Sequence, residues 1–482
     1  MLSSGEMKVD NEALKTRWLK RRKNTTFVFY TQSFLLGVEY SLTFTYLYLY
    51  LKDVLKTDKA IFFYSAISTV FLLSMIVASL VFGKLFDKFR NLRQMFIFSN
   101  VMIFIGNLLY CIPLSPWLLF FGRLLAGIGG ASRPIMSGEI VRCYTGKDIV
   151  TQLLRLGMAF GIGFIAGPGM NFFFLKADFM FLGIHFTYIN SAVLMLVFVA
   201  LAQFLASIFF VSDLSKEYDP KGEAEKNDNE KIDSDPPKDE SSTKLSDTKN
   251  MDDNEKQPLL QSGSILYQST GDARPNMWNF FKSLAKHKKI AVIFMFSGFY
   301  FFMDCLYDIW QPIAFVQFIG WGNFEINLVN FGYGICSIIF FIILYFVSPS
   351  QMGVLYLTKV TMVENMALVS IFMVWKLYNA SFELNVGMSV LYCFFFAMTI
   401  LMEEVFLINA LAQLVSTDKQ SFAEGVRLSC SRTGALTSLL ISPVLFEYLE
   451  YVCPVFVTIM IIFLFIFHFN QHWYINPKVI VF

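Results

Sequence analysis

The chain has 482 residues, of which 55% are hydrophobic, 17% aromatic and only 16% charged, and its formal net charge is +2. Soluble domains carry about 25% charged residues, so this composition is typical of a membrane protein, and the small net charge argues against a nucleic-acid-binding protein. The seven cysteines and four histidines are scattered, so we expect no disulfide framework, metal site or cofactor.

Long apolar runs dominate the chain, and a helix needs about 20 mostly apolar residues to cross a bilayer core. In the first half these runs cover residues 27–51, 61–82, 94–112, 117–140, 151–174 and 188–211. In the second half they cover residues 290–318, 328–347, 355–377, 387–415, 425–446 and 452–469. The sequence therefore predicts an all-α membrane protein with twelve transmembrane helices in two six-helix bundles.

The same runs divide the chain into five parts. We expect a tail over 1–26, a first bundle over 27–211, a linker over 212–289, a second bundle over 290–470 and a tail over 471–482. The linker is rich in Asp, Glu, Lys, Ser and Asn and poor in aromatic residues, a composition that favours disorder. Lys and Arg gather before the first and seventh runs and after the second and fourth, which predicts that both tails and the linker are cytosolic.

One sequon is placed outside the cytosol by this topology. Asn379 begins the sequence Asn-Ala-Ser in the loop after the ninth run, so we expect it to be glycosylated.

The loop after the second run, "GKLFDKFRNLR", carries an acidic residue among cations. Its notable residues are Gly83, Asp87, Lys88, Arg90 and Arg93. From its charge alone such a loop is best explained as a solvated, positively charged turn, in which the carboxylate caps a helix or pairs with a neighbouring cation.

Two glycine-rich stretches follow on the fourth and fifth runs. "GRLLAGIGG" places Arg123 four residues before Gly127, and "GIGFIAGPG" contains Gly163, Gly167 and Pro168. A cation that snorkels to the membrane surface and a plain packing helix would explain these stretches without any further function.

Together the three stretches resemble the motifs of the major facilitator superfamily, in the same order and on the same helices. The resemblance implies a secondary transporter with alternating access, in which the loop at Asp87 holds one state closed and Arg123 is tied to substrate or proton movement. The corresponding loop of the second half, from Ser348, has lost the pattern. Within the superfamily, the stretch from Arg123 to Pro168 is most similar to the domain-containing protein 8 family, lysosomal proteins linked to neuronal ceroid lipofuscinosis.

The linker contains a candidate sorting signal. In "NEKQPLLQ", Glu255 precedes Leu259 and Leu260 at the spacing of an acidic dileucine motif, which a clathrin adaptor binds in flexible cytosolic segments. A chance match in so long a polar segment is the alternative. The motif and the resemblance predict an endolysosomal membrane protein.

Ionisable residues within apolar runs are costly and therefore mark functional candidates. The candidates for substrate binding or proton coupling are Glu39, Arg123, Arg133, Arg155, Asp304, Asp308, Glu403, Glu404 and Arg432. We expect Glu39, Asp304 and Glu403 or Glu404 to face a central cavity, where one carboxylate exchanges a proton and the arginines bind an anionic group. Static salt bridges between helices are the competing explanation.

The sequence thus predicts a monomeric transporter of a small anionic organic solute across the lysosomal membrane, with proton coupling. The resembled family implies breakdown products such as glycerophosphodiesters, or a chloride conductance. An anion channel or leak pathway on the same fold and a non-transporting membrane scaffold are the alternatives. No Ser-His-Asp set or nucleotide-binding loop indicates an enzyme.

Overall fold

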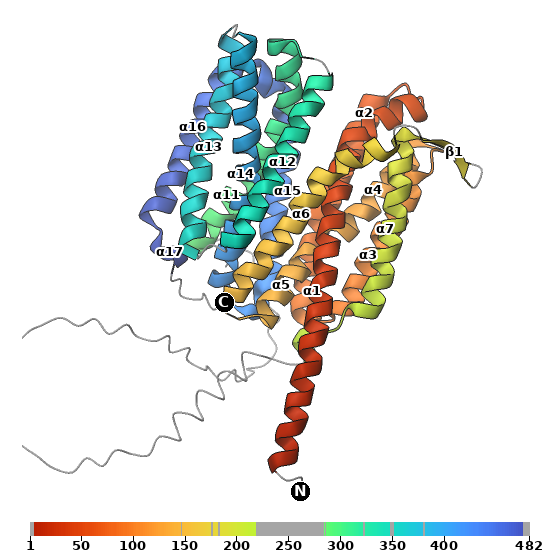
Figure 1. Ribbon diagram of the computed structural model, residues 1–482, viewed down its shortest axis with the longest axis vertical. Helices are drawn as coiled ribbons and strands as arrows, with labels where there is room; N and C mark the ends of the chain where they lie inside the picture. Colours follow the sequence, from red (N-terminus) through yellow and green to blue (C-terminus); the bar gives the residue numbers. More distant parts are fainter. Residues whose placement is uncertain are drawn as a thin grey trace, which may run out of the picture.

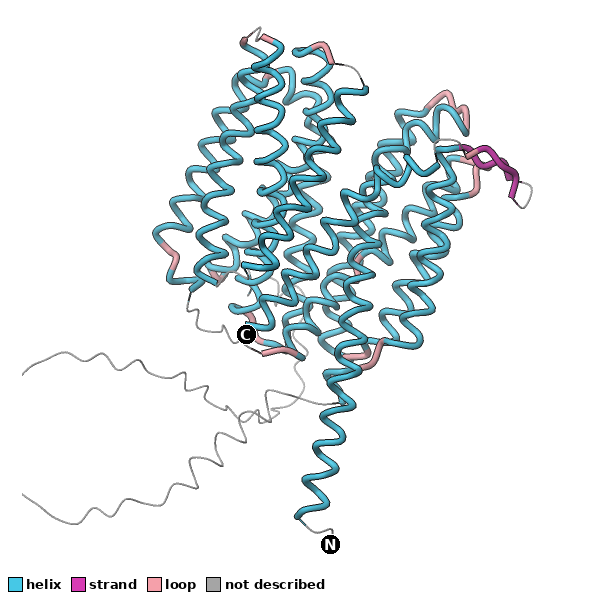
Figure 2. The backbone as a smooth tube through the Cα atoms, in the orientation of Figure 1, coloured by secondary structure: helices cyan, strands magenta, loops and turns pink. Residues whose placement is uncertain are grey.

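The computed structural model describes residues 4–145, 147–174, 177–181, 184–217, 284, 286–321, 323–347, 351–378 and 381–475. Helices make up almost all of this backbone (Figure 2), and the strands within it form one hairpin at the edge of the molecule.

The elements of the first half follow one another with short connections. They are α1 (Ser4–Leu49), the π-helical turn η1 (Tyr50–Val54), α2 (Ala60–Phe89), α3 (Leu92–Cys111), α4 (Pro116–Gly130), α5 (Arg133–Cys143), α6 (Lys147–Phe174), β1 (Asp178–Phe181), β2 (Ile184–Thr187), α7 (Tyr188–Phe210) and α8 (Leu214–Glu217).

The second half is helical throughout its described length. Its elements are α11 (Lys288–Ala314), the π-helical turn η2 (Phe315–Ile319), α12 (Asn323–Val347), α13 (Gln351–Leu377), α14 (Phe382–Leu414), the 3-10 turn η3 (Thr417–Lys419), α15 (Gln420–Glu447), α16 (Leu449–Phe469) and α17 (His472–Ile475).

Seven helical stretches in the described residues are long and apolar enough to cross a membrane, judged by length and composition. They lie in α2, α3, α7, α11, α13, α14 and α16. The prediction of an all-α membrane protein is confirmed. The count of twelve spans stays a prediction, because other predicted spans fall on helices that are shorter, such as α4, or less apolar, such as α15.

The fourth predicted span, residues 117–140, is not one continuous helix. Helix α4 ends at Gly130 and α5 begins at Arg133. Pro134 in the first turn of α5 explains the break, since proline has no N–H to bond to the preceding turn and its ring crowds the carbonyl there. The break places Arg133 at the start of a helix.

Two further features were not predicted. The segment expected as an N-terminal tail is helical from Ser4 and forms the first part of α1. Between α6 and α7, the antiparallel strands β1 and β2 pair Phe179 with Phe186 and Phe181 with Ile184. Strands of four residues each are too short to give a clear periodic signal in the sequence.

The two halves lie side by side in Figure 1, with α1 to α7 in red to yellow-green and α11 to α17 in green to blue. They approach each other near α5, toward the end from which the N-terminal part of α1 projects, and diverge toward the opposite end. Helices α2 and α5 contact α15 there, while α6 contacts α12 and α14. Residues on these helices are therefore placed to line a site between the halves.

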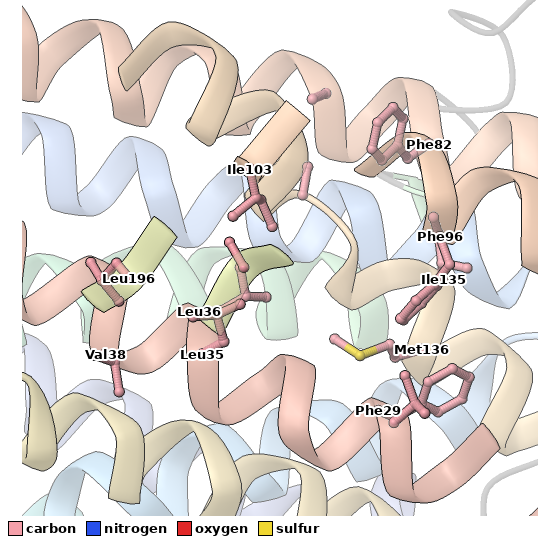
Figure 3. Close-up of a cluster of buried hydrophobic side chains, with 14 of the residues drawn as sticks. Phe29, Leu35, Leu36, Val38, Phe82, Phe96, Ile103, Ile135, Met136 and Leu196 are labelled. Carbon is pink, nitrogen blue, oxygen red and sulfur yellow. The ribbon is translucent and has the colours of Figure 1, made fainter. Parts of the chain in front are cut away.

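Apolar side chains from several helices form the core of the first half. Figure 3 shows part of this core, with Phe29, Leu35, Leu36, Val38, Phe82, Phe96, Ile103, Ile135, Met136 and Leu196. All ten are buried, and they come from α1, α2, α3, α5 and α7. This packing joins the helices of the first half into one body.

Helices α1 and α6 touch through their glycines. A Cβ atom on Gly163 would lie 2.0 Å from the carbonyl oxygen of Phe34, and one on Gly167 would lie 2.0 Å from Oγ of Ser41. Only a residue without a side chain permits this approach, as is common where membrane helices pack closely. The predicted packing motif, which also contains Pro168, therefore lies at the contact between α6 and α1.

Candidate functional site

A cavity lies between the halves, and its empty space, including the part that is open to solvent, is about 830 Å³. Its walls come from α1, α5 and α6 of the first half and from α11, α12, α14 and α15 of the second. Aromatic and apolar side chains form most of the lining, and five acidic or basic side chains reach it: Arg133, Asp304, Asp308, Glu404 and Arg432. Mostly apolar walls with a few convergent polar groups are typical of sites for small molecules.

Four charged side chains form a buried cluster at one wall. Arg427 donates to both carboxylate oxygens of Glu404, at 2.9 and 3.0 Å, and to both of Glu424, at 2.8 and 2.7 Å. Glu404 also pairs with Nη2 of Arg133 at 2.9 Å. Because Arg133 belongs to the first half and Glu404 to the second, this ion pair joins the halves directly.

The guanidinium of Arg133 is not fully satisfied. It is 4% exposed, yet none of its nitrogens, Nε, Nη1 and Nη2, has a hydrogen-bond partner, and only Nη2 has the ion pair with Glu404. Its carbon Cζ lies 5.1 Å from the ring centroid of Phe160. Buried donors without partners are costly, so Arg133 is prepared to bind an acceptor in the cavity.

Arg432 is the second cation of the lining. It makes no hydrogen bond or ion pair to any residue that the structure describes; instead its Cζ lies 4.9 Å from the ring centroid of Tyr40 and 5.3 Å from that of Phe301. Cation–π contacts of this kind hold a guanidinium in place without neutralising it. Its charge therefore remains available to an anion.

Asp304 and Asp308 lie one helical turn apart on α11, and both reach the cavity. Asp304 is 7% exposed, and its Oδ1 has no hydrogen-bond partner. Asp308 is exposed. The sequence therefore selected two carboxylates that share the face of α11 turned to the cavity.

We expected Glu39 to face the cavity, but it is not among the residues that line it. Glu39 is 2% exposed and accepts a hydrogen bond from Nη1 of Arg123 at 3.1 Å. Arg123 is itself 1% exposed, and its Cζ lies 3.8 Å from the ring centroid of Phe71. The neighbouring residue Tyr40 lines the cavity instead, so Glu39 and Arg123 form an ion pair inside the first half.

Other predicted residues lie elsewhere or outside the described residues. Arg155 interacts electrostatically with Tyr30 and is absent from the lining. The side chain of Glu403 is not described, and neither are Asn379 nor the sorting signal at Glu255, Leu259 and Leu260. In the described part of the chain, no group of three or more His, Cys, Asp or Glu side chains is placed to hold a metal ion.

The gating-loop residue Asp87 connects the two halves at the closed end. Its carboxylate accepts hydrogen bonds from the backbone N–H groups of Ser421, at 3.1 Å, and Phe422, at 2.8 Å. These residues form the first turn of α15, where exposed N–H groups and the helix dipole favour an anion. Arg142 of α5 pairs with the same carboxylate and donates to the Thr417 carbonyl at 3.1 Å.

The cations of the loop have different partners. Arg90 pairs with Asp418 of the second half. Arg93 stays within the first half, donating its backbone N–H to Asp213 at 2.9 Å and its Nη2 to the Ile208 carbonyl at 2.7 Å. Lys88 is exposed and lies over the ring of Phe89. Only part of the positively charged loop therefore contacts the other half.

Helices α2 and α15 touch where the loop begins. A Cβ atom on Gly83 would lie 2.4 Å from the Ser421 carbonyl oxygen, and one on Gly425 would lie 2.5 Å from that of Ser79. Oγ of Ser429 donates to the Ile76 carbonyl at 3.0 Å. The backbones are thus in direct contact, and this end of the interface is closed.

Several residues of these sites were not predicted. Tyr40, Asp418 and the N-terminus of α15 gave no signal in the sequence, and Arg142 stood out only as one of the cations after the fourth apolar run. Arg142 sits at the end of an apolar run close to Asp87 in the fold but 55 residues away in sequence. Pairing at such a separation cannot be inferred from spacing within one helix.

Two helical halves around a mostly apolar cavity that a few charged side chains reach, closed at one end, are typical of a membrane transporter of small solutes. The chain belongs to the Major Facilitator Superfamily, which residues 29–405 match. It is therefore a transporter and not an enzyme, and the resemblance of its three motifs to this superfamily is confirmed at the level of the family.

Individual relatives are distant. The chain is 26% identical over 118 residues to the class B tetracycline resistance protein of Escherichia coli, covering 24% of this chain and 29% of that protein. For the class H protein of Pasteurella multocida the identity is 26% over 105 residues, with 22% and 26% covered. The chain thus matches less than a third of these relatives' length.

A solved structure shares the fold. The crystal structure of the human organic anion transporter MFSD10 (TETRAN) superposes with a TM-score of 0.61 at 12% sequence identity, covering 92% of this chain and 98% of that chain. At this identity the likeness shows the fold alone.

Proposed function

We propose that the protein carries a small anionic organic solute across the lysosomal membrane by alternating access, with proton coupling. The observation that carries this proposal is the buried guanidinium of Arg133, which lines the cavity with two donor atoms unsatisfied. Arg432, a second cation without an ion pair among the described residues, lines the same cavity. A carboxylate, sulfonate or phosphate group would satisfy donors of both.

Charge balance supports proton coupling at Glu404. In the buried cluster, Arg133 and Arg427 oppose Glu404 and Glu424, so the cluster is neutral as it stands. A monovalent anion on Arg133 would leave one uncompensated negative charge in a dry environment, which is costly. A proton on Glu404 would restore neutrality and would release Arg133 from the ion pair.

Other charged groups face Glu404 as well. Arg432 of α15 interacts with it electrostatically, and so does Asp304 of α11. These two neighbours carry opposite charges, so they do not change the argument from neutrality. We therefore assign the exchanged proton to Glu404.

The contacts of Asp87 support the alternating-access part of the proposal. Asp87 and Arg133 both bridge the halves, at the end of the interface and beside the cavity respectively. Transport to the other side requires both bridges to break. With the cytosolic orientation predicted by the positive loops, the state described is closed to the cytosol.

Location rests on the sequence. The dileucine motif, the predicted lumenal sequon at Asn379 and the resemblance to the domain-containing protein 8 family together support a glycosylated lysosomal protein sorted by a clathrin adaptor. We propose membership in that family and a monomeric state on the same grounds.

The experiment is metabolite profiling of lysosomes with and without the protein, followed by flux in proteoliposomes. An organic anion that accumulates without the protein should be transported, faster under an inward proton gradient. Glu404→Gln should abolish the effect of the gradient while counterflow persists. Glu364→Gln is the matched control, because Glu364 lies on α13 and does not line the cavity. Absence of flux for every accumulated anion would contradict the proposal, and single-channel currents would favour the channel alternative.

A further inference from the structure

We propose that the transported solute carries a cationic group as well as an anionic one, and that Asp304 and Asp308 bind the cationic group. This inference rests on the proposed function, because it leaves the anionic group on the arginines of the cavity. It adds a second subsite of opposite charge on α11.

The carboxylates of α11 have room for a ligand. Asp308 lines the cavity, is exposed within it, and makes no hydrogen bond or ion pair to the described residues. Asp304 is more than nine-tenths buried, and its Oδ1 has no partner although the side chain reaches the cavity. A buried acceptor without a partner is costly unless a ligand satisfies it. An ammonium group with several N–H donors would satisfy both residues.

Along α11, Asp308 lies at a different level from the ring on which Arg432 packs, and Asp304 lies between the two. Arg432 packs on Phe301 of α11, and Asp308 follows Phe301 by seven residues on the same helix. At 1.5 Å per residue, the two positions are separated by about 10 Å along the helix axis. No ion pair joins Arg432 to either carboxylate among the described contacts, so each charge is free to meet a different end of one solute.

Charge balance favours a solute with both charges. Apart from the neutral cluster around Glu404, the lining contains one basic side chain, Arg432, and two acidic side chains, Asp304 and Asp308. When both aspartates are ionised, a purely anionic solute would add negative charge to a cavity that already has an excess of it. A solute with an ammonium group next to Asp308 would avoid this repulsion, and the ring of Tyr333, which also lines the cavity, provides an aromatic face for the cation.

The competing explanation is that the two aspartates share a proton and bind no ligand. Then an anion and the matching zwitterion would bind equally well, and replacing Asp308 would change the pH dependence for both. If the inference is correct, replacing Asp308 changes only the preference between them.

The experiment compares ε-aminocaproate, caproate and hexylamine, which share one chain length and differ only in their charged ends. Binding is measured at fixed pH from the rise in Tm of the full-length chain, since a ligand that binds only the folded state stabilises it by mass action. We expect ε-aminocaproate to bind at least about tenfold more tightly than caproate, the gain of one charge-assisted interaction. Asp308→Asn should abolish this preference by weakening ε-aminocaproate binding without weakening caproate binding, whereas Glu364→Gln should behave like the wild type.

Equal affinity of the wild type for ε-aminocaproate and caproate would overturn the inference, and so would a preference that persists in Asp308→Asn. Asp304→Asn provides a second test of the same subsite, with the same expected loss of preference. A failure of the proposed function would look different from a failure of this inference. If the arginines do not bind the anionic group, Arg432→Gln will not weaken the binding of caproate.

Discussion

Replacing Asp87 by Asn tests the contact that closes one end of the interface. The substitution keeps the size of the side chain and removes its charge. It should weaken the pairing with Arg142 and the hydrogen bonds from Ser421 and Phe422, because a neutral amide oxygen accepts less strongly than a carboxylate.

The size of the effect follows from these contacts. A carboxylate at a helix N-terminus contributes about 0.3 to 2 kcal/mol, and a hydrogen bond to a charged group exceeds a neutral one by roughly 1 kcal/mol. We therefore expect the closed state to lose about 2 kcal/mol relative to the state open at this end. That loss corresponds to a shift of about 30-fold in their ratio.

A cysteine in place of Ser429 provides the measurement, since Ser429 is 8% exposed and bonds across the interface to Ile76. Its reaction with a bulky maleimide requires opening, so Asp87→Asn should speed labelling by up to about 30-fold. The control is Lys88→Gln, which removes a charge from the same loop without touching α15. Equal labelling rates in wild type and Asp87→Asn would refute the reasoning and leave the loop an ordinary solvated turn.

Three further predictions concern packing, charge and sorting. Gly163→Leu should lower stability by about 1 to 3 kcal/mol, since its Cβ would overlap the backbone of α1, and thermal unfolding measures this. Glu39→Gln should cost about 3 to 5 kcal/mol by leaving Arg123 buried without its ion pair, seen as lower Tm and yield. Alanine at both Leu259 and Leu260 should move the protein to the plasma membrane, visible by microscopy.

Each of these has its own control. Gly157→Ala should be nearly neutral, because the nearest atom to its Cβ would be 3.8 Å away; equal losses at Gly157 and Gly163 would contradict the packing argument. If the double variant Glu39→Gln, Arg123→Met recovers the Tm of the wild type, the ion pair between Glu39 and Arg123 is structural. Wild-type stability of Glu39→Gln alone would contradict the predicted cost of breaking this ion pair. Unchanged lysosomal staining would rule out the dileucine signal.

The sequence predicted those features that depend on residues close together in the chain. Apolar runs predicted the helices, and charges inside those runs selected Asp304, Asp308 and Glu404, which do line the cavity. It was misleading at Glu39, because adjacent residues on a helix point about 100° apart and depth in the membrane does not define the face. Tyr40, one residue further, takes the place expected for Glu39.

Pairings between distant segments were beyond the sequence. The partners of Asp87 come from α5 and α15, and Glu404 is shared between Arg133 and Arg427, whose positions are almost 300 residues apart. Such contacts depend on how the halves pack, which periodicity within one helix does not encode. The sequence also did not predict the break between α4 and α5 before Pro134, which places Arg133 in the cavity wall.

Helix α1 extends without interruption beyond the other helices of the first half. Trp18 is buried against the Leu214 carbonyl, and the residues from Ser4 to Arg17 continue the same helix beyond it (Figure 1), which at 1.5 Å per residue is about 20 Å. Any tilt of the first half during transport is therefore amplified at the tip of this rod. A probe or a binding partner at Ser4 would sense the conformation of the cavity without approaching it.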